Sequence, residues 1–219
     1  MRYLPAALLI LLWCVPSSAG VLERAQQHLP VYRQAVAVHW PAMPMPYIPC
    51  GQVEQESSWK ERATLKTSRE LGRGLTQMTI AYRTDGSERF NIYREAVKWR
   101  ALRAWDWRND PYNVQYQLAF LVLQDRANFT AMTPFFRDDT ERWKASLVSY
   151  NAGQGRVLAR RAVAVSRGIP TDRWTGGLDG AHGPQEDKLL YGRPLWKAVN
   201  EYPVKVLQRS EKYRSLFRR

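Results

Sequence analysis

Glu56 is the residue whose type and setting are best suited to acid–base chemistry in this chain of 219 residues. It belongs to the segment 51–59, Gly-Gln-Val-Glu-Gln-Glu-Ser-Ser-Trp, which is typical of a helix. At about 100° per residue, Glu56 lies near the face of Val53, whereas Glu54 points elsewhere. Partial burial raises the pKa of a carboxyl group and suits it to donate a proton near neutral pH. Taken alone, the position still favours the ordinary alternative, a solvated helix glutamate.

Three later segments carry polar side chains on turns, and together with Glu56 they favour a functional role for that glutamate over a solvated one. Residues 74–78, Gly-Leu-Thr-Gln-Met, form a tight glycine turn that presents an amide, Gln77. Residues 150–155, Tyr-Asn-Ala-Gly-Gln-Gly, are a helix end that runs into a glycine-rich turn. Residues 201–206, Glu-Tyr-Pro-Val-Lys-Val, place Tyr202 near the C-terminus. The four segments together form one candidate constellation.

Other chemistries lack their signatures in the sequence. The three histidines, His28, His39 and His182, lie in no cluster with ligand spacing, so we expect no metal and no cofactor. The chain has neither a GxSxG elbow nor a Walker loop, and the Gly-Arg-Gly at 72–74 is too short and charged for a dinucleotide loop. Basic residues are scattered along every predicted helix, which argues against a dedicated nucleic-acid reader.

Helices dominate the elements that must position these side chains. The pattern predicts helices over 54–62, 91–107, 113–127, 139–150 and 155–167, and a last helix over 193–216 that is interrupted near Pro203. Strand signals are weak, and 74–82 and 87–93 are the best candidates. Before the core, 21–38 is expected to form two short helical pieces because of Pro30. Four prolines between 41 and 49 predict an extended segment.

Composition bounds the class of protein. Apolar residues make up 45% and charged residues 24%, which is close to the average for globular chains and excludes disorder over most of the length. The net charge of +13 indicates an anionic partner without choosing one. Two cysteines, Cys14 and Cys50, exclude a disulfide scaffold. We interpret Cys50 as a buried small hydrophobe, with a reactive or intermolecular thiol as the alternative.

Residues 1–19 are predicted to be a secretory signal peptide. Arg2 precedes an apolar run over 4–15, and small residues, Ser17 and Ala19, mark a cleavage site. The run is too short to span a membrane, which takes about 20 apolar residues. Lipid attachment at Cys14 is the rival interpretation, but bulky Trp13 precedes it. The protein is therefore expected to be exported, to the periplasm or the extracellular space.

The chain resembles the soluble lytic transglycosylases, a branch of the lysozyme-like superfamily. Glu56-Ser57 and the three turns agree with that family in order and spacing, from residue 51 to about 212. This sequence has a longer stretch between Glu56 and Gly74, Thr76 in place of methionine and Ser149 in place of alanine, and its loop 176–188 matches nothing in the pattern. The resemblance implies a mainly α, lysozyme-like fold with a minimal β element. It implies a single catalytic domain over 51–219 after an N-terminal extension over 20–50.

The implied activity is cleavage of the β-1,4 bond between N-acetylmuramic acid and N-acetylglucosamine in peptidoglycan. Glu56 is the single acid/base implied, and the muramyl 6-hydroxyl attacks to give a 1,6-anhydro product. This differs from the two-carboxylate scheme of most glycosidases. Glu70 and Asp85 are the nearest other acids, which we interpret as a surface charge and a turn residue.

The resemblance also implies substrate contacts for six residues, namely Ser57, Ser68, Gln77, Tyr150, Asn151 and Tyr202. Gln77 is expected to bond an N-acetyl group or orient Glu56, and Tyr202 to hold Glu56. All of them except Ser57 have an ordinary alternative as a loop serine, a turn amide or a packed side chain. Five aromatics could stack on sugars but are more often core: Trp99, Trp105, Trp107, Tyr112 and Tyr116.

Peptidoglycan glycan strands are the expected partner of a monomeric enzyme, and their carboxylates would attract its positive charge. No nucleic acid is expected, and machinery for secretion or conjugation that spans the envelope is a further partner class. Two other functions stay open: a hydrolytic lysozyme on the same fold, and a non-catalytic exported protein that binds peptidoglycan or another polyanion.

Overall fold

The computed structural model describes residues 18–190 and 192–217, which form two compact units. The sheet unit contains residues 18–123 and 206–217, and the helical unit contains residues 124–190 and 192–205. The chain passes between them within two long helices, α4 (Val114–Met132) and α7 (Leu195–Ser210). Except for its last two residues, the predicted leader lies outside the described residues. No helix in the described part of the chain is long and apolar enough to cross a membrane.

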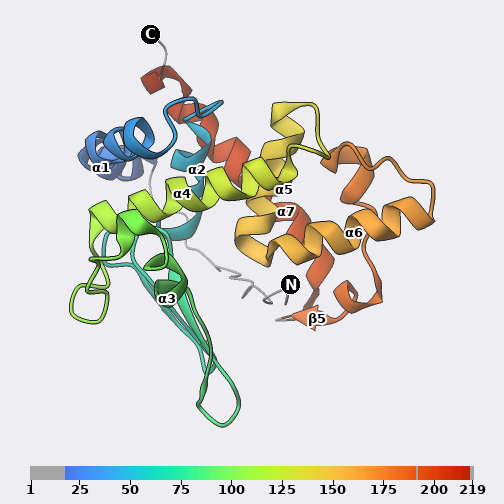
Figure 1. The fold of residues 1–219 in the computed structure, drawn as a ribbon, viewed down its shortest axis with the longest axis horizontal. Coiled ribbons are helices and arrows are strands. Elements are labelled where there is room, and N and C mark those ends of the chain that lie inside the picture. The colour runs from blue at the N-terminus through green and yellow to red at the C-terminus, as the bar shows by residue number, and fades with distance from the viewer. Residues whose placement is uncertain (1–17, 191, 218–219) are drawn as a thin grey trace. The chain divides into compact units, whose positions relative to one another are not determined.

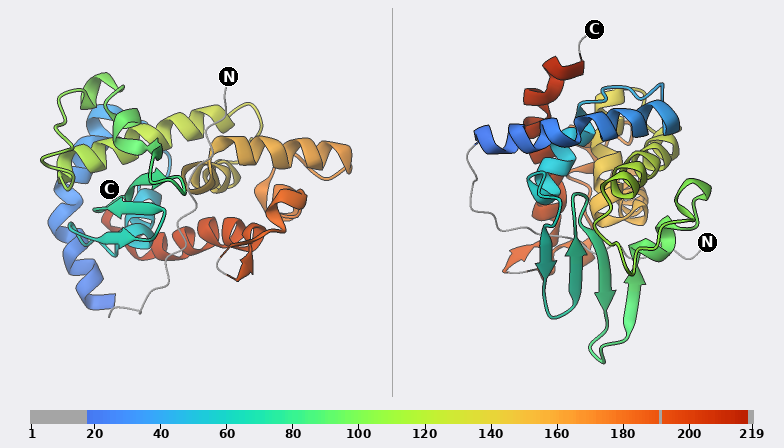
Figure 2. Two further views of the ribbon diagram at one scale, coloured as in Figure 1. Left: turned by 90° about the horizontal axis from the view of Figure 1, so that it is seen from below. Right: turned by 90° about the vertical axis from the view of Figure 1, so that its left-hand side faces the viewer.

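The predicted mainly helical fold with a small β element is confirmed (Figure 1). The sheet unit holds one four-stranded antiparallel sheet, in the order β1-β2-β3-β4, whose strands lie side by side in the right-hand view of Figure 2. The strands are β1 (Thr64–Lys66), β2 (Glu70–Arg73), β3 (Met78–Tyr82) and β4 (Glu88–Asn91). Weak signals predicted β3 and β4, whereas β1 and β2 are too short to show an alternating pattern.

The N-terminal extension contains one helix, α1 (Ser18–His39), so the predicted break at Pro30 is wrong. A proline removes the hydrogen bond to the carbonyl four residues earlier. Pro30 and Gln26 are both exposed, so water can satisfy that carbonyl. The opposite face holds the helix together through its buried side chains, Val21, Ala25, Leu29, Tyr32 and Ala35.

Helix α2 (Ile48–Ser57) begins and ends earlier than the predicted 54–62. Pro49 lies in its first turn, where a missing N–H costs nothing. The predicted extended segment over 41–49 is wrong, because residues 41–47 form turns and bends, in which the Met43 N–H donates to the Trp40 carbonyl and the Ile48 N–H to the Met45 carbonyl. Ser58 and Trp59 then take left-handed backbone angles, with φ of 51° and 59°, and stop the helix. The Trp59 ring is fully buried, and its burial offsets this strain.

The predicted long helix over 91–107 is also wrong. Only α3 (Ile92–Ala96) forms, capped by the Asn91 side chain, and it is followed by turns and a short 3₁₀ helix, η1 (Arg100–Leu102). Stacking of Tyr93 on Trp107, with ring centroids 5.1 Å apart, folds the chain back on itself. Packing of these rings overrides the helical preference of the segment.

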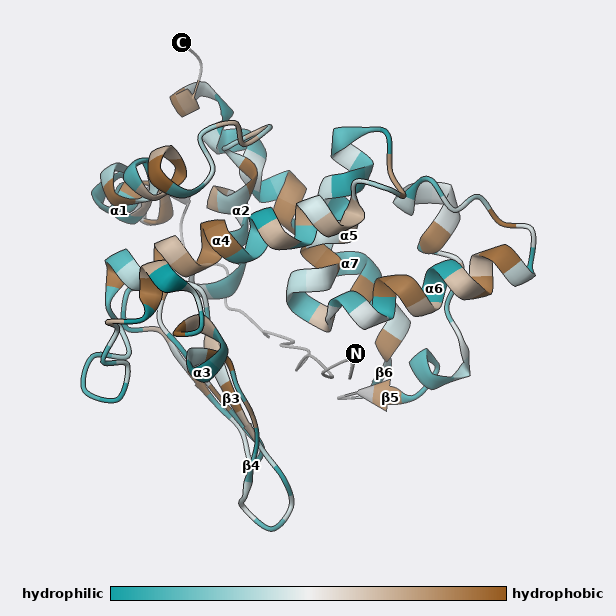
Figure 3. Cartoon of the chain, in the orientation of Figure 1, coloured by the Kyte–Doolittle hydropathy of each residue, from teal (hydrophilic) through white to brown (hydrophobic). Residues whose placement is uncertain are grey.

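In the helical unit, α5 (Asp139–Ala152) and α6 (Gln154–Ser166) confirm the predicted helices. Figure 3 shows apolar and polar bands that alternate along α6. The apolar sides pack with the π-helical turn η2 (Trp174–Leu178) and α7 around a core that includes Phe136, Val148, Val157, Trp174, Leu178 and Val199. A 3₁₀ turn, η3 (Pro184–Glu186), and two short strands, β5 (Leu189–Leu190) and β6 (Arg193–Pro194), connect η2 to α7.

Helix α7 runs through Pro203 without the predicted interruption and ends at Ser210. A 3₁₀ segment, η4 (Glu211–Phe217), completes the described chain. Val199, Tyr202 and Val206 are buried at helical spacing on both sides of the proline. Their burial keeps the helix continuous despite the lost hydrogen bond.

Candidate active site

Helix α2 is buried almost all round, and it carries two acids into the sheet unit. Glu56 is 3% exposed and Glu54 is 8% exposed. The predicted burial of Glu56 is therefore confirmed. Ser57 is also buried, and its hydroxyl donates to the Val53 carbonyl oxygen at 3.0 Å, one helical turn earlier.

Glu54 belongs to a polar cluster with the C-terminal segment. Its carboxylate accepts hydrogen bonds from the Tyr213 hydroxyl at 2.6 Å and from Lys212 Nζ at 2.9 Å. The Tyr213 oxygen in turn accepts from Trp59 Nε1 at 3.1 Å. Burial, together with the bond to the Glu54 carboxylate, raises the pKa of Tyr213. Glu54 is thus a structural acid, which ties α2 to η4.

The predicted turn over 74–77 is present and is strained at Gln77. This residue has φ of 48°, a left-handed angle that is uncommon without glycine. Its side chain is 4% exposed, and its Nε2 donates to the Gly74 carbonyl oxygen at 3.1 Å. Its Oε1 is buried and accepts a hydrogen bond from no described residue. The strained backbone and the unsatisfied acceptor make Gln77 a candidate functional position.

Gln117 on α4 supports this turn, and sequence reasoning missed it. Its Oε1 accepts from the Thr76 backbone N–H at 3.3 Å, and its Nε2 donates to the Pro111 carbonyl oxygen at 2.8 Å. A Cβ at Gly74, where φ is +77°, would lie 2.0 Å from Gln117 Nε2. The glycine is required for this close approach. No motif marks Gln117, because its partners are distant in sequence.

Ser68 is not brought to this turn. It lies exposed in the loop that joins β1 to β2. At the end of this hairpin near Ser68, Lys66 pairs with Leu71, and at the opposite end Thr64 pairs with Arg73. The 74–77 turn follows β2 at that other end, where the Gly74 N–H donates to the Ala63 carbonyl oxygen at 2.7 Å. Ser68 and Gln77 therefore lie at opposite ends of the sheet.

The other three predicted residues belong to the helical unit. Asn151 is buried near the end of α5, and its Oδ1 accepts a hydrogen bond from no described residue. Tyr150 beside it is half-buried, and Tyr202 on α7 is buried. Glu201 pairs with Arg193 and Lys205, whose hydrogen bonds outweigh the effect of burial and lower the pKa of that carboxyl group.

The two other candidate acids of the sheet unit have partners of their own. Glu70 on β2 lies 3.7 Å from Arg89, and burial raises the pKa of Glu70 more than Arg89 lowers it. The exposed Asp85 accepts hydrogen bonds from the Ser87 hydroxyl at 2.7 Å and from its backbone N–H at 2.9 Å, which lower the pKa of Asp85. The prediction of a turn at Asp85 is confirmed.

The candidate sugar-binding aromatics are largely engaged with one another and with cations. Trp105 is buried and stacks on Tyr116, with centroids 5.4 Å apart, so it is a core residue. The Arg62 guanidinium lies over the Tyr112 ring at 4.9 Å. Cys50 is fully buried, which raises the pKa of its thiol and confirms the interpretation of a small core residue.

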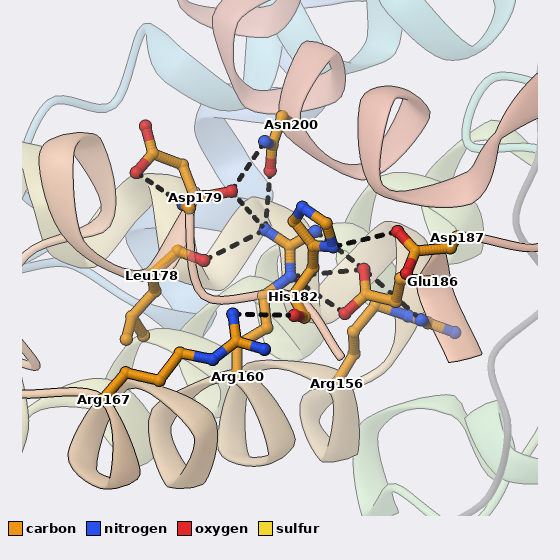
Figure 4. Close-up of polar contacts among 10 residues, drawn as sticks. Arg156, Arg160, Arg167, Leu178, Asp179, His182, Glu186, Asp187 and Asn200 are labelled. Carbon is orange, nitrogen blue, oxygen red and sulfur yellow. Dashed lines mark hydrogen bonds and ion pairs between the residues drawn. The ribbon is translucent and has the colours of Figure 1, made fainter. Parts of the chain in front are cut away.

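A buried arginine organises the loop over 176–188, and nothing in the sequence pattern predicted it. Arg160 on α6 is 0% exposed and donates to Glu186 from Nε at 3.0 Å and from Nη2 at 2.7 Å. Figure 4 shows that its Nη1 also reaches the Leu178 carbonyl and Asn200 Oδ1, at 3.1 and 2.6 Å. The loop is therefore fixed to α6 and α7 by one guanidinium.

Comparison of the chain with protein-family models and with characterised proteins found no match. Within the described residues, no group of three or more His, Cys, Asp or Glu side chains could hold a metal ion.

Proposed function

We propose that this protein is an exported peptidoglycan lytic transglycosylase with a lysozyme-like fold. The observation that carries the proposal is the strained Gln77, whose buried Oε1 lacks a hydrogen-bond donor among the described residues. A buried acceptor left unsatisfied is costly, so a ligand N–H is a suitable partner. An N-acetyl group on a sugar supplies such an N–H.

Asn151 supports the same interpretation independently. It too is a predicted substrate contact, and its buried Oδ1 likewise accepts from no described residue. Two amide oxygens at motif positions in different parts of the chain thus have unused acceptor capacity. Amide side chains with this capacity suit a substrate that carries an N-acetyl group on every sugar.

Glu56 is the proposed acid/base. In its protonated form it donates a proton to the glycosidic oxygen as the bond to the anomeric carbon breaks. The resulting carboxylate accepts the proton of the muramyl 6-hydroxyl as that oxygen bonds to the anomeric carbon. Glu56 is then protonated again, no water is consumed, and the muramyl product is a 1,6-anhydro sugar. The tethered hydroxyl has a high effective concentration at the reacting carbon.

The partners of the other acids favour this route over hydrolysis. Most inverting and retaining hydrolases use a second carboxylate across the glycosidic bond. Glu54 is bonded to Tyr213 and Lys212, Glu70 is paired with Arg89, and Asp85 is held in its own turn. None of these three is a suitable second carboxylate.

Digestion of purified cell walls tests the proposal, with Glu56→Gln alongside. Wild type should lyse the wall. The rate of lysis should fall by about 10²–10⁴-fold or more in the variant, because general acid–base catalysis contributes a factor of this size. Mass spectrometry should find muropeptides lighter by one water (about 18 Da) than the hydrolysed products, as ring closure by the tethered hydroxyl requires. Reducing ends would indicate a lysozyme, and binding without cleavage would indicate a non-catalytic wall protein.

A further inference from the structure

A groove of about 380 Å³ lies in the helical unit between one face of α6 and the segment 183–186. This volume is within the range of small-molecule sites, about 300–1,000 Å³. Small side chains leave the space open: the lining residues include Ala152, Gly155, Ala159, Val163, Gly183 and Pro184. The groove suits a small ligand with short aliphatic groups.

The charged residues of the groove do not balance. Arg156 and Arg160 line it on one side and Glu186 on the other. Arg160 bonds the Glu186 carboxylate closely, whereas Arg156 Nη1 is 3.5 Å from the same Oε2 atom. Charge-assisted hydrogen bonds are shorter than this, about 2.7–2.9 Å. Figure 4 shows both guanidinium groups directed to the one carboxylate, which leaves one positive charge in excess.

Arg156 also has unused donor capacity. Its side chain is 25% exposed, and its buried Nε donates to no described residue. The planar guanidinium can bind a carboxylate through two parallel hydrogen bonds. Arg160 is different, because its hydrogen bonds hold the loop and its side chain is fully buried.

We propose that this groove binds the free carboxylate of a short peptide with alanine-sized side chains, and that Arg156 is the residue that binds it. The excess charge selects the anion, the fork of the guanidinium selects a carboxylate, and the small lining residues select short side chains. As to the source of the peptide, the inference rests on the proposed function, since peptidoglycan peptides carry such carboxylates.

The test is calorimetric titration of the full chain with the dipeptide alanyl-alanine. We expect saturable binding that is at least about 10-fold weaker for the C-terminally amidated dipeptide and at least about 10-fold weaker in Arg156→Gln. Arg161→Gln is the matched control, because Arg161 is on the same helix but lies over Phe135 at 4.5 Å and does not line the groove. This control should bind as wild type does.

Ala159→Leu gives a second route, since it fills the groove and leaves both arginines in place. Ala159→Leu should abolish binding of the dipeptide, and it tests the groove even if the separate variant Arg156→Gln fails to fold. Equal binding of the amidated dipeptide, equal competition by inorganic phosphate, or unchanged affinity in Ala159→Leu would each overturn the proposal. The titration involves no cleavage, so a protein that lyses walls without binding the dipeptide refutes only this inference. Binding without lysis refutes only the proposed function.

Discussion

The Tyr213 hydroxyl donates a 2.6 Å hydrogen bond to the carboxylate of Glu54, two residues before the proposed acid Glu56. The bond joins η4 to α2 across 159 positions of the sequence. It ties the first of two neighbouring buried glutamates to the C-terminal segment, which indicates a structural role for Glu54. The two acids can therefore be separated by experiment, because one is expected to affect stability and the other activity.

Glu54→Gln should destabilise the fold by about 1.5–3 kcal/mol, the usual contribution of hydrogen bonds to a charged group. The amide is a weaker acceptor for Tyr213 and leaves Lys212 without its counter-charge. Urea unfolding measures the change. Glu61→Gln is the control, because Glu61 is exposed and should change stability by no more than about 0.5 kcal/mol. Equal values for the two variants would contradict the structural role of Glu54.

The sequence predicted α4, α5 and α6 well because each has a regular apolar pattern and ends at clear turns. It also predicted the burial of Glu56 and the turn at Gln77. It failed at Pro30, where one exposed position on an otherwise well-packed helix tolerates a proline. It failed again over 91–107, where contacts between rings such as Tyr93 and Trp107 override local preference. In both segments, packing against residues distant in the sequence determines the backbone conformation, and the local sequence pattern carries no information about that packing.

The same limit applies to the residues that support the site. Gln117 and Arg160 look like ordinary polar residues of exposed helix faces. Gln117 is buried because the backbone of Thr76, 41 positions away, needs an acceptor. Arg160 is buried because Glu186, 26 positions away, neutralises it. Their roles come from the fold, so a motif could identify Gln77 but not the side chain that supports its turn.

Gly74→Ala should cost about 2 kcal/mol or more in stability. The left-handed backbone alone costs a residue with a Cβ about 1–2 kcal/mol, and this Cβ would also displace Gln117. Gly86→Ala is a matched control, since its φ is +80° and a Cβ there would meet nothing within 4 Å. The difference between the two variants measures the contact with Gln117.

The double variant Gly74→Ala/Gln117→Ala sharpens this test. Removal of the Gln117 side chain relieves the clash, so the two changes should be less than additive by about 0.5 kcal/mol or more. Strict additivity would mean that the turn moves away from Gln117 instead. On the proposed function, Gly74→Ala should also reduce wall lysis more than Gly86→Ala does.

Glu70→Gln should stabilise the protein at neutral pH. Burial raises the pKa of Glu70 above its usual value of 4.5, with Arg89 opposing. Between the unfolded and the folded pKa, the folded state binds more protons, so stability falls as the pH rises through this window. The amide has no charge to bury and removes that loss. The unfolding midpoint at pH 7 relative to that at pH 4 should therefore be higher in Glu70→Gln than in wild type.

Asp85→Asn should show the opposite sign. Hydrogen bonds from the Ser87 hydroxyl and backbone N–H lower the pKa of Asp85 below 3.8. Its contribution is present above the unfolded pKa and is lost as the pH falls through the folded pKa. Asp85→Asn should thus destabilise at pH 7, and this effect should diminish as the pH falls below 3.8. If both variants shifted in the same direction at pH 7, the assignment of the one with the unexpected sign would be wrong.

Glu186→Gln should be the most damaging of these changes, with a cost near the about 3–5 kcal/mol typical of a broken buried ion pair. Arg160 is fully buried, and the variant leaves its charge with neutral acceptors alone, namely the amide oxygen of the new side chain, the Leu178 and Asp179 carbonyls and Asn200 Oδ1. Hydrogen exchange should speed up most over 176–188, because that loop depends on the pair. Asp187→Asn is the control, because the Asp187 side chain is 60% exposed and its replacement should change the stability little. If Glu186→Gln left exchange in the loop unchanged, the guanidinium would not be what fixes it.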